Sequence, residues 1–279
     1  MSVQNSIDGP ENLSATEREA LEALLFRLAD DELVIGERYQ DWIVKAPTLE
    51  SDLSLANITQ DEFGHARLWY TLLKDLGYEE SDLIYERDPN DFANATLVEL
   101  AFADGDWADV VVRGFLYDQA EAVRLRTMTD STYAPLADRV PKVLREEEYH
   151  RDYSQNWLVQ LTSEEQGRSR VQAAVDRLVP YALTLFEGST NVDETIVDAG
   201  FRNEPLSALR NEWLDTVALS LETYGISVPD VAHLEASMPD AIGRDGTHTA
   251  DWIDLHDEMT LAYRRLGRDD TERVMDDPE

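Results

Sequence analysis

Residues 60–67 read Gln60-Asp61-Glu62-Phe63-Gly64-His65-Ala66-Arg67 and place a glutamate three residues before a histidine. Positions three apart lie on one side of a helix, so the Glu62 carboxylate and the His65 imidazole project together. The same pair returns at Glu147 and His150. A four-helix bundle that binds two metal ions in its core uses this pair twice, with one further carboxylate from each of its other two helices. The two pairs therefore predict such a bundle, provided that two more core carboxylates exist.

Two lone carboxylates interrupt apolar helical stripes elsewhere in the chain. Glu32 lies 30 residues before Glu62, and Asp118 lies 29 residues before Glu147. An Ala-Pro break separates the lone carboxylate from the Glu-x-x-His pair in each half, as expected for two helical hairpins related by a pseudo-twofold axis. The predicted metal ligands are Glu32, Glu62, His65, Asp118, Glu147 and His150.

The alternative is a buried salt-bridge network without metal. Burying four carboxylates and two imidazoles without a cation costs several kcal/mol for each uncompensated charge, which favours a metal site. A carboxylate-rich set with one histidine per ion suits iron, with manganese as the alternative, and the absence of cysteine excludes disulfides, thiolate sites and iron–sulfur clusters. Asp61 and Glu146 precede the ligand glutamates and are candidates to accept the second ring N–H of a histidine, although both positions are equally compatible with solvated side chains.

The helical periodicity predicts an all-α, ferritin-like four-helix bundle with additional C-terminal helices. We expect a disordered lead at 1–13, the bundle at 14–162, and a helical extension at 163–279 that ends in an acidic tail. The extension is either part of the same domain or an interface lobe. Helices are predicted from the capping box at 14–17 to a break at 46–47, then over 49–77, 107–129, about 140–161, 163–187, 205–224 and 252–266, with a short helix at 96–102 inside the long connection 78–106. His233, His248 and His256 have no partner pattern and are expected at caps or on the surface.

The net charge of -34 is extreme for a chain that is 43% hydrophobic, so the composition excludes a disordered acidic protein. An acidic, lysine-poor surface is typical of a halophilic protein, in which high salt screens the self-repulsion; binding of a strongly basic partner is the alternative. Nucleic-acid binding is excluded because no basic patch could neutralise phosphates. No apolar run is long enough to span a membrane and no signal peptide is recognised, so we expect a cytoplasmic protein without a membrane partner.

Several segments together resemble one known family. Ala46-Pro47-Thr48-Leu49, the stretch 60–65, and the segments 115–120, 146–153 and 246–249 are similar to the phenylacetyl-CoA 1,2-epoxidase family of ferritin-like bacterial multicomponent oxygenases. The short N-terminus and the Gly-Thr-His-Thr segment at 246–249 look like the C subunit of that family, a scaffold that has lost most metal ligands. The six ligand positions look like those of the A subunit, the catalytic partner.

The resemblance implies a subunit of a di-iron oxygenase that epoxidises the aromatic ring of phenylacetyl-CoA in phenylacetate catabolism. It implies other epoxidase subunits, including a small bridging subunit, as partners in a homo- or hetero-oligomer. An aromatic CoA thioester would be the substrate, and electrons would come from a separate reductase because the chain has no dinucleotide fingerprint. Phe63, Phe115 and Trp157 are candidates for the ring pocket or are plain core. The alternatives are a scaffold subunit without catalysis, or another dimetal enzyme such as a benzoyl-CoA epoxidase-like oxygenase or a manganese catalase-like protein.

Overall fold

The computed structural model describes residues 6–266, and over that range the regular elements are helices, with one isolated bridge between Ile7 and Tyr133. The predicted all-α class is confirmed. The elements are η1 Pro10–Asn12, α1 Ala15–Ile43, α2 Leu49–Asp75, α3 Glu80–Leu83, η2 Pro89–Asp91, α4 Thr96–Glu99, α5 Trp107–Arg126, α6 Ala134–Ala137, α7 Val140–Thr162, α8 Glu165–Ala182, η3 Leu183–Phe186, α9 Thr190–Asp198, α10 Leu206–Glu222, α11 Val231–Ala236, η4 Gly243–Asp245 and α12 Ala250–Leu266.

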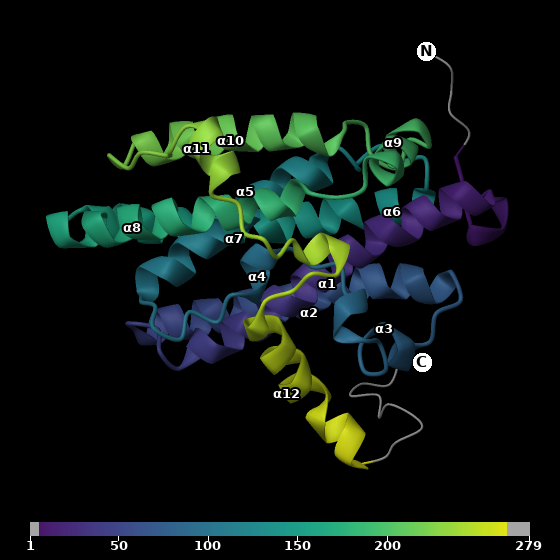
Figure 1. The fold of residues 1–279 in the computed structure, drawn as a ribbon, viewed down its shortest axis with the longest axis horizontal. Coiled ribbons are helices and arrows are strands. Elements are labelled where there is room, and N and C mark those ends of the chain that lie inside the picture. Colours follow the sequence, from purple (N-terminus) through teal and green to yellow (C-terminus); the bar gives the residue numbers. More distant parts are fainter. Residues whose placement is uncertain (1–5, 267–279) are drawn as a thin grey trace.

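Four long helices form the central bundle. α1 packs along α2, α5 packs along α7, and contacts between α2 and α7 join the two hairpins (Figure 1). The connection from α2 to α5 carries only short elements, among them α4, which packs against α1 and α8. This crossover brings the second hairpin beside the first, which is the arrangement that a shared site between the hairpins requires.

Local sequence signals set the ends of the bundle helices. Ser14 and Glu17 form a capping box at the start of α1, and Asp106 and Asp109 form another at the start of α5. The Thr48 hydroxyl accepts a hydrogen bond from the Ser51 N–H at 3.1 Å and caps α2 directly after the Ala-Pro break. These caps begin the helices at the predicted positions.

Glycine at position 36 allows α1 and α2 to approach closely beside the site. A Cβ atom there would lie 2.9 Å from the Phe63 ring and 3.4 Å from the Glu62 Cβ. Any larger residue would therefore push the helix that carries Glu62 away from the helix that carries Glu32.

The C-terminal helices continue the same core. α8 and α10 pack on α5, and α9 packs on α1. The buried Trp213 side chain of α10 donates from Nε1 to the Leu116 carbonyl of α5 at 3.0 Å. In Figure 1, α10 lies along the edge opposite α12, with α5 and α8 between them. Helices α8, α9 and α10 therefore pack directly on the bundle, whereas the predicted acidic tail at 267–279 lies outside the described residues.

Two expectations about connecting segments differ from the structure. The disordered lead was predicted for 1–13, yet residues 6–13 are placed against the body: the Ile7 N–H donates to the Thr132 carbonyl at 2.7 Å, and the Ala134 N–H donates to the Ile7 carbonyl at 3.0 Å. Residues 1–5 lie outside the described range. The segment between the helices predicted at 163–187 and 205–224 was not predicted to be helical, yet it contains α9, whose buried Ile196 packs into the core.

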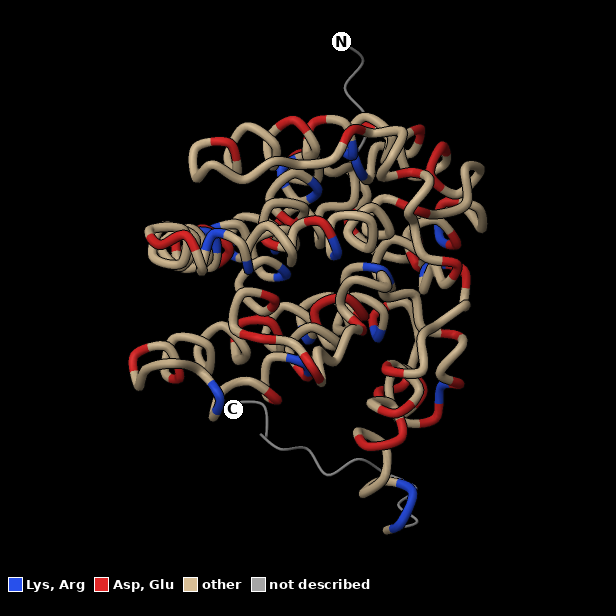
Figure 2. Tube along the Cα trace, turned by 60° about the vertical axis from the view of Figure 1, so that its left-hand side comes forward, with Lys and Arg blue, Asp and Glu red and all other residues tan. Residues whose placement is uncertain are grey.

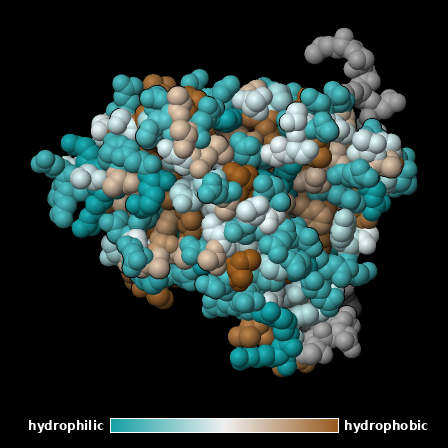
Figure 3. All heavy atoms as spheres, in the orientation of Figure 1, coloured by the Kyte–Doolittle hydropathy of each residue, from teal (hydrophilic) through white to brown (hydrophobic). Residues whose placement is uncertain are grey.

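Acidic residues recur along nearly all of the outer helices, and basic residues are fewer (Figure 2), in keeping with 58 acidic against 24 basic side chains. On the face shown in Figure 3 the surface is mainly hydrophilic, with small separate hydrophobic spots. Over residues 6–266, no helix combines the length and the apolar character needed to cross a membrane.

Candidate metal centre

All six predicted ligand side chains meet in the interior between the two hairpins. Each is at most 2% exposed. α1 supplies one carboxylate, α5 supplies the second, and α2 and α7 each supply a Glu-x-x-His pair, so that the contributors are Glu32, Asp118, Glu62, His65, Glu147 and His150. The polar interruptions of the four apolar stripes therefore lie together in one place.

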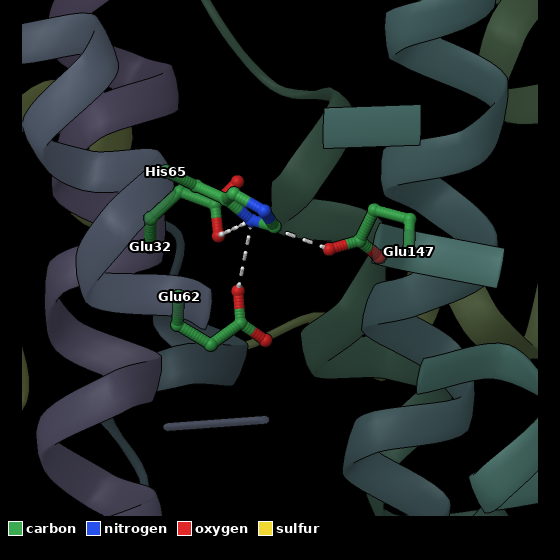
Figure 4. A group of neighbouring side chains, drawn as sticks. All are labelled: Glu32, Glu62, His65 and Glu147. Atoms are coloured by element: carbon green, nitrogen blue, oxygen red, sulfur yellow. Dashed lines mark ion pairs between the residues drawn. The ribbon is translucent and has the colours of Figure 1, made fainter. Parts of the chain in front are cut away.

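One half of the centre surrounds the His65 imidazole. Its Nδ1 atom lies 3.7 Å from Glu32 Oε2, 3.8 Å from Glu62 Oε2 and 3.6 Å from Glu147 Oε1 (Figure 4). One donor atom from each of these four residues lies within 4.8 Å of every other. Three carboxylates and one imidazole at this separation can surround a single divalent ion.

The other half is formed by Glu62, Asp118 and His150, whose donor atoms also lie within 4.8 Å of one another. His150 Nδ1 lies 3.6 Å from Glu62 Oε1 and 3.1 Å from Glu147 Oε1. Glu62 thus belongs to both groups, and Glu147 faces both imidazoles. The His65 and His150 ring centres are 6.0 Å apart. Two neighbouring ions that share carboxylates fit this arrangement.

The outer nitrogen of each imidazole contacts a carboxylate from the opposite hairpin. His65 Nε2 on α2 lies 3.0 Å from Glu146 Oε2 on α7, and His150 Nε2 on α7 lies 3.5 Å from Asp61 Oδ2 on α2. A carboxylate beside each Nε2 favours an N–H on that nitrogen, and this orientation of the ring directs each Nδ1 toward the centre. Lys142 Nζ donates to Glu146 at 2.7 Å. Asp61 and Glu146 are 37% and 31% exposed, so they connect the buried rings with solvent.

The inner atoms of the centre have the donor chemistry of a metal site. Both carboxylate oxygens of Glu32, Glu62 and Glu147, together with Nδ1 of His65 and His150, are buried and make no hydrogen bond to any group within the described residues. Buried polar atoms are nearly always paired, so this convergent set of carboxylates and imidazoles is suited to a cationic partner. Divalent ions that prefer oxygen and imidazole ligands fit it.

The pKa values of the clustered residues also show that the site does not hold four uncompensated negative charges. Burial and the neighbouring Glu32 raise the pKa of the Glu62 carboxyl well above its ordinary value, and burial and Glu147 do the same for the pKa of Asp118. Burial opposes charging of His65, but Glu32 and Glu147 outweigh it and raise the pKa of His65 to about 9. Protons therefore neutralise the cluster where no cation does, and a metal ion that binds there must displace them.

The sequence interpretation missed a second buried network. Glu99 in α4 accepts hydrogen bonds from Asn94 Nδ2 at 3.0 Å, His248 Nδ1 at 2.6 Å, and the Thr249 N–H and hydroxyl at 2.9 and 2.7 Å. His248 was expected at a cap or on the surface, but its side chain is fully buried, and His256 is only 6% exposed. His233 lies on the surface as expected. Glu99 and His248 are 149 residues apart, so no local spacing could have linked them.

Buried acids next to Glu32 were also missed. Asp30 accepts from Tyr70 and Arg87, and Asp31 accepts from Arg124 and Arg244, so each of the three consecutive acids belongs to a different cluster. The sequence feature that could have revealed these networks is the run of three consecutive acidic residues, Asp30 to Glu32. Three adjacent helical positions span about 200° of the helix surface, so they cannot all face one site.

Comparisons with known proteins identify one family and two related subunits. The family described as "Phenylacetic acid catabolic protein" matches residues 1–268. The chain is 29% identical over 249 residues to the C subunit of 1,2-phenylacetyl-CoA epoxidase from Escherichia coli (strain K12), an alignment that covers 88% of this chain and 97% of that relative. It is 26% identical over 197 residues to the A subunit of the same enzyme, an alignment that covers 68% of this chain and 62% of that relative.

Proposed function

The chain belongs to the phenylacetic acid catabolic protein family, and we propose that it is a subunit of a multicomponent oxygenase that epoxidises the aromatic ring of phenylacetyl-CoA. The observation that carries the proposal is the convergence of six buried metal-binding side chains in a chain that is similar to two subunits of such an epoxidase. The proposed partners are the other epoxidase subunits, with a separate reductase as the electron source. The proposed location is the cytoplasm.

The proposed cofactor is a pair of iron ions, with manganese as the alternative. Glu32, Glu62, His65 and Glu147 would hold one ion, and Glu62, Asp118 and His150 would hold the other, with Glu62 shared. Reduced iron supplies the reactivity toward O₂ that ring epoxidation needs and that amino-acid side chains lack. Glu146 and Asp61 keep the two imidazoles oriented from outside.

The six side chains of the centre are at most 2% exposed, so bulk water does not reach them directly. Phe115 is fully buried, and Phe63 packs against the backbone at Gly36. Tyr39 on α1 is buried, and burial together with Asp118 and Glu62 raises its pKa well above the ordinary value, so it stays a neutral phenol beside the carboxylates. A dry site strengthens the attraction between carboxylates and cations and protects reactive species from side reactions.

A second role is supported by the alignment with the C subunit of the epoxidase, which covers nearly all of that relative. In this role the chain is a scaffold that organises a separate catalytic subunit and carries out no chemistry itself. The full set of six converging side chains favours the catalytic role, because a purely structural bundle gains nothing from burying four carboxylates together.

The experiment compares His65→Ala with the wild-type chain after each is purified in complex with the partner subunits. Turnover of phenylacetyl-CoA is measured with reductase and O₂, and iron is quantified in the same samples. The catalytic role predicts that His65→Ala reduces turnover to background while the complex stays assembled. His233→Ala, at an exposed histidine, is the control and should retain full turnover. Unchanged turnover by the His65→Ala complex would establish the scaffold role, and no turnover by the wild-type complex would refute the proposed reaction.

We also propose that the acidic surface is an adaptation to high salt. Screening shortens the range of repulsion from about 10 Å at 0.1 M salt to about 3 Å at 1 M. The melting temperature of the chain should therefore rise steadily with potassium chloride up to molar concentrations. A melting temperature that is flat above about 0.2 M salt would contradict this adaptation.

A further inference from the structure

A small cavity lies beside α1, apart from the six predicted metal ligands, and four arginines contribute to its lining. Its volume is about 10 Å³. Arg27 of α1, Arg124 of α5, Arg202 and Arg244 line it together with leucines and one methionine. Four guanidinium groups around one cavity are unexpected in a chain with a net charge of -34.

Three of these arginines are almost completely buried. The side chains of Arg124, Arg202 and Arg244 are 5%, 2% and 1% exposed. Buried cations of this kind are found only with compensating partners, because the loss of hydration costs several kcal/mol for each charge. The number of carboxylates in contact with these arginines therefore decides whether their positive charges are compensated.

The carboxylates within contact distance are fewer than the arginines. Asp31 Oδ2 lies 2.9 Å from Arg124 Nη1 and 2.5 Å from Arg244 Nη2, so one carboxylate serves two cations. Glu121 also contacts Arg124. The remaining contact joins Arg202 to Asp193. Arg27 forms no ion pair within 4.0 Å among residues 6–266.

Several N–H groups at the cavity also lack acceptors. Nη1 of Arg27, Nε of Arg124 and Nε of Arg244 are buried and make no hydrogen bond to a described group. Burial and the nearby Arg244 and Arg202 outweigh the opposing effect of Asp193 and Asp31 and lower the pKa of Arg27 to about 10. Residues with unpaired buried donors thus line the cavity from α1, α5 and the segment after α11.

The geometry points to a monovalent anion of halide size, such as chloride, bound in this cavity by Arg27, Arg124 and Arg244. A volume of about 10 Å³ accommodates one species close to water in size, so polyatomic anions such as phosphate and carboxylates are too large, and a halide is the anion nearest to this size. A water molecule would fit, but it would leave the charge surplus in place. A bound halide compensates the unpaired guanidinium and accepts hydrogen bonds from all three arginines.

The anion would join parts of the chain that are distant in sequence. Arg244 Nη1 also donates to the Arg27 carbonyl at 3.2 Å, and Arg124 Nη1 donates to the Leu185 carbonyl at 3.5 Å. The site therefore links α1, α5 and the C-terminal segment without using a metal ligand. This inference does not depend on the proposed epoxidase function.

The test measures thermal unfolding of the purified full-length chain in sodium chloride, sodium bromide and sodium gluconate at equal ionic strength. Gluconate screens the surface charge equally but is too large for the cavity. Wild-type protein should melt at higher temperature in chloride or bromide than in gluconate. The difference should grow by roughly 3 °C for each tenfold rise in halide concentration above the dissociation constant.

Arg27→Gln should remove the halide-specific difference, because it removes the guanidinium that has no carboxylate partner. Arg265→Gln, which removes one exposed positive charge near the end of α12, is the matched control and should keep it. Equal melting in halide and gluconate for the wild type, or a halide effect that persists in Arg27→Gln, would overturn the site. If Arg27→Gln does not fold, wild-type crystals grown in bromide decide: an anomalous peak between Arg27 and Arg244 supports the site, and its absence refutes it.

Discussion

The Nε2 atom of His65 lies 3.0 Å from the Oε2 atom of Glu146, so an imidazole of one helical hairpin is oriented by a carboxylate of the other. Outer carboxylates of this kind fix the ring and increase the basicity of the inner nitrogen. We therefore expect Glu146→Ala to weaken metal binding by about 10- to 100-fold.

The measurement is a competitive metal titration of the metal-free chain. Glu148→Ala removes an exposed carboxylate from the same turn of α7 and should leave the affinity unchanged. An equal loss in both variants would mean that Glu146 acts only through the overall negative charge.

Glu62 belongs to both groups of converging donors, whereas Asp118 belongs to one. Glu62→Gln should therefore abolish binding of both ions, and Asp118→Asn should remove one and leave the other. Metal analysis of the purified variants, with Glu148→Gln as the control, gives the stoichiometry directly. One full equivalent of metal retained by Glu62→Gln would show that this carboxylate does not bridge.

The free energy of unfolding should change with pH because of Glu37 on α1. Burial, followed by repulsion from Asp41 and Glu258, raises the pKa of Glu37 from 4.5 to about 7. The folded state therefore keeps a proton that the unfolded state has released, so this group's contribution is fully present below pH 4.5 and is lost as pH rises toward 7. Glu37→Gln should be more stable than the wild type by about 1–3 kcal/mol at pH 8 and nearly equal to it at pH 4.5.

Urea unfolding at the two pH values tests this prediction. Added salt should reduce the gain at pH 8, because the repulsion from Asp41 and Glu258 is screened. A stability difference of the same size at both pH values would show that Glu37 titrates normally.

Glu99 accepts four hydrogen bonds from Asn94, His248 and Thr249 in a fully buried setting. His248→Ala removes one partner of a buried pair and should destabilise the chain by about 3–5 kcal/mol. His233→Ala provides an exposed control. Limited proteolysis should cut the His248→Ala variant faster between 225 and 250, and an unchanged cleavage rate would show that the network does not hold this segment.

The positions of the bundle helices could be predicted because the sequence features that indicate them lie close together in the chain. Glu62 and His65 are three residues apart on a helical stripe, and the Thr48 cap follows an Ala-Pro break. Such spacings depend only on helix geometry. The convergence of Glu32 and Asp118 with the Glu-x-x-His pairs was predicted because each lies about 30 residues before the pair of its own hairpin. The role of these residues as metal ligands stays a prediction.

The networks outside the metal centre could not be predicted, because their partners are distant in the sequence. Asp31 contacts Arg244, which lies 213 residues away, and Glu99 contacts His248. No periodicity relates such residues. α9 was missed because its short run of Thr190–Asp198 lies among turn-forming residues, and its helical state depends on packing against α1.

The exchange of outer carboxylates between the hairpins has a consequence for how the protein matures. His150 depends on Asp61, just as His65 depends on Glu146, and Glu62 and Glu147 each face the imidazole of the other hairpin. A single hairpin thus contains neither a complete donor set nor the groups that aim its own histidine. Metal uptake by the proposed centre would therefore follow the docking of the two halves, and a newly made chain would complete that docking with protons in place of cations.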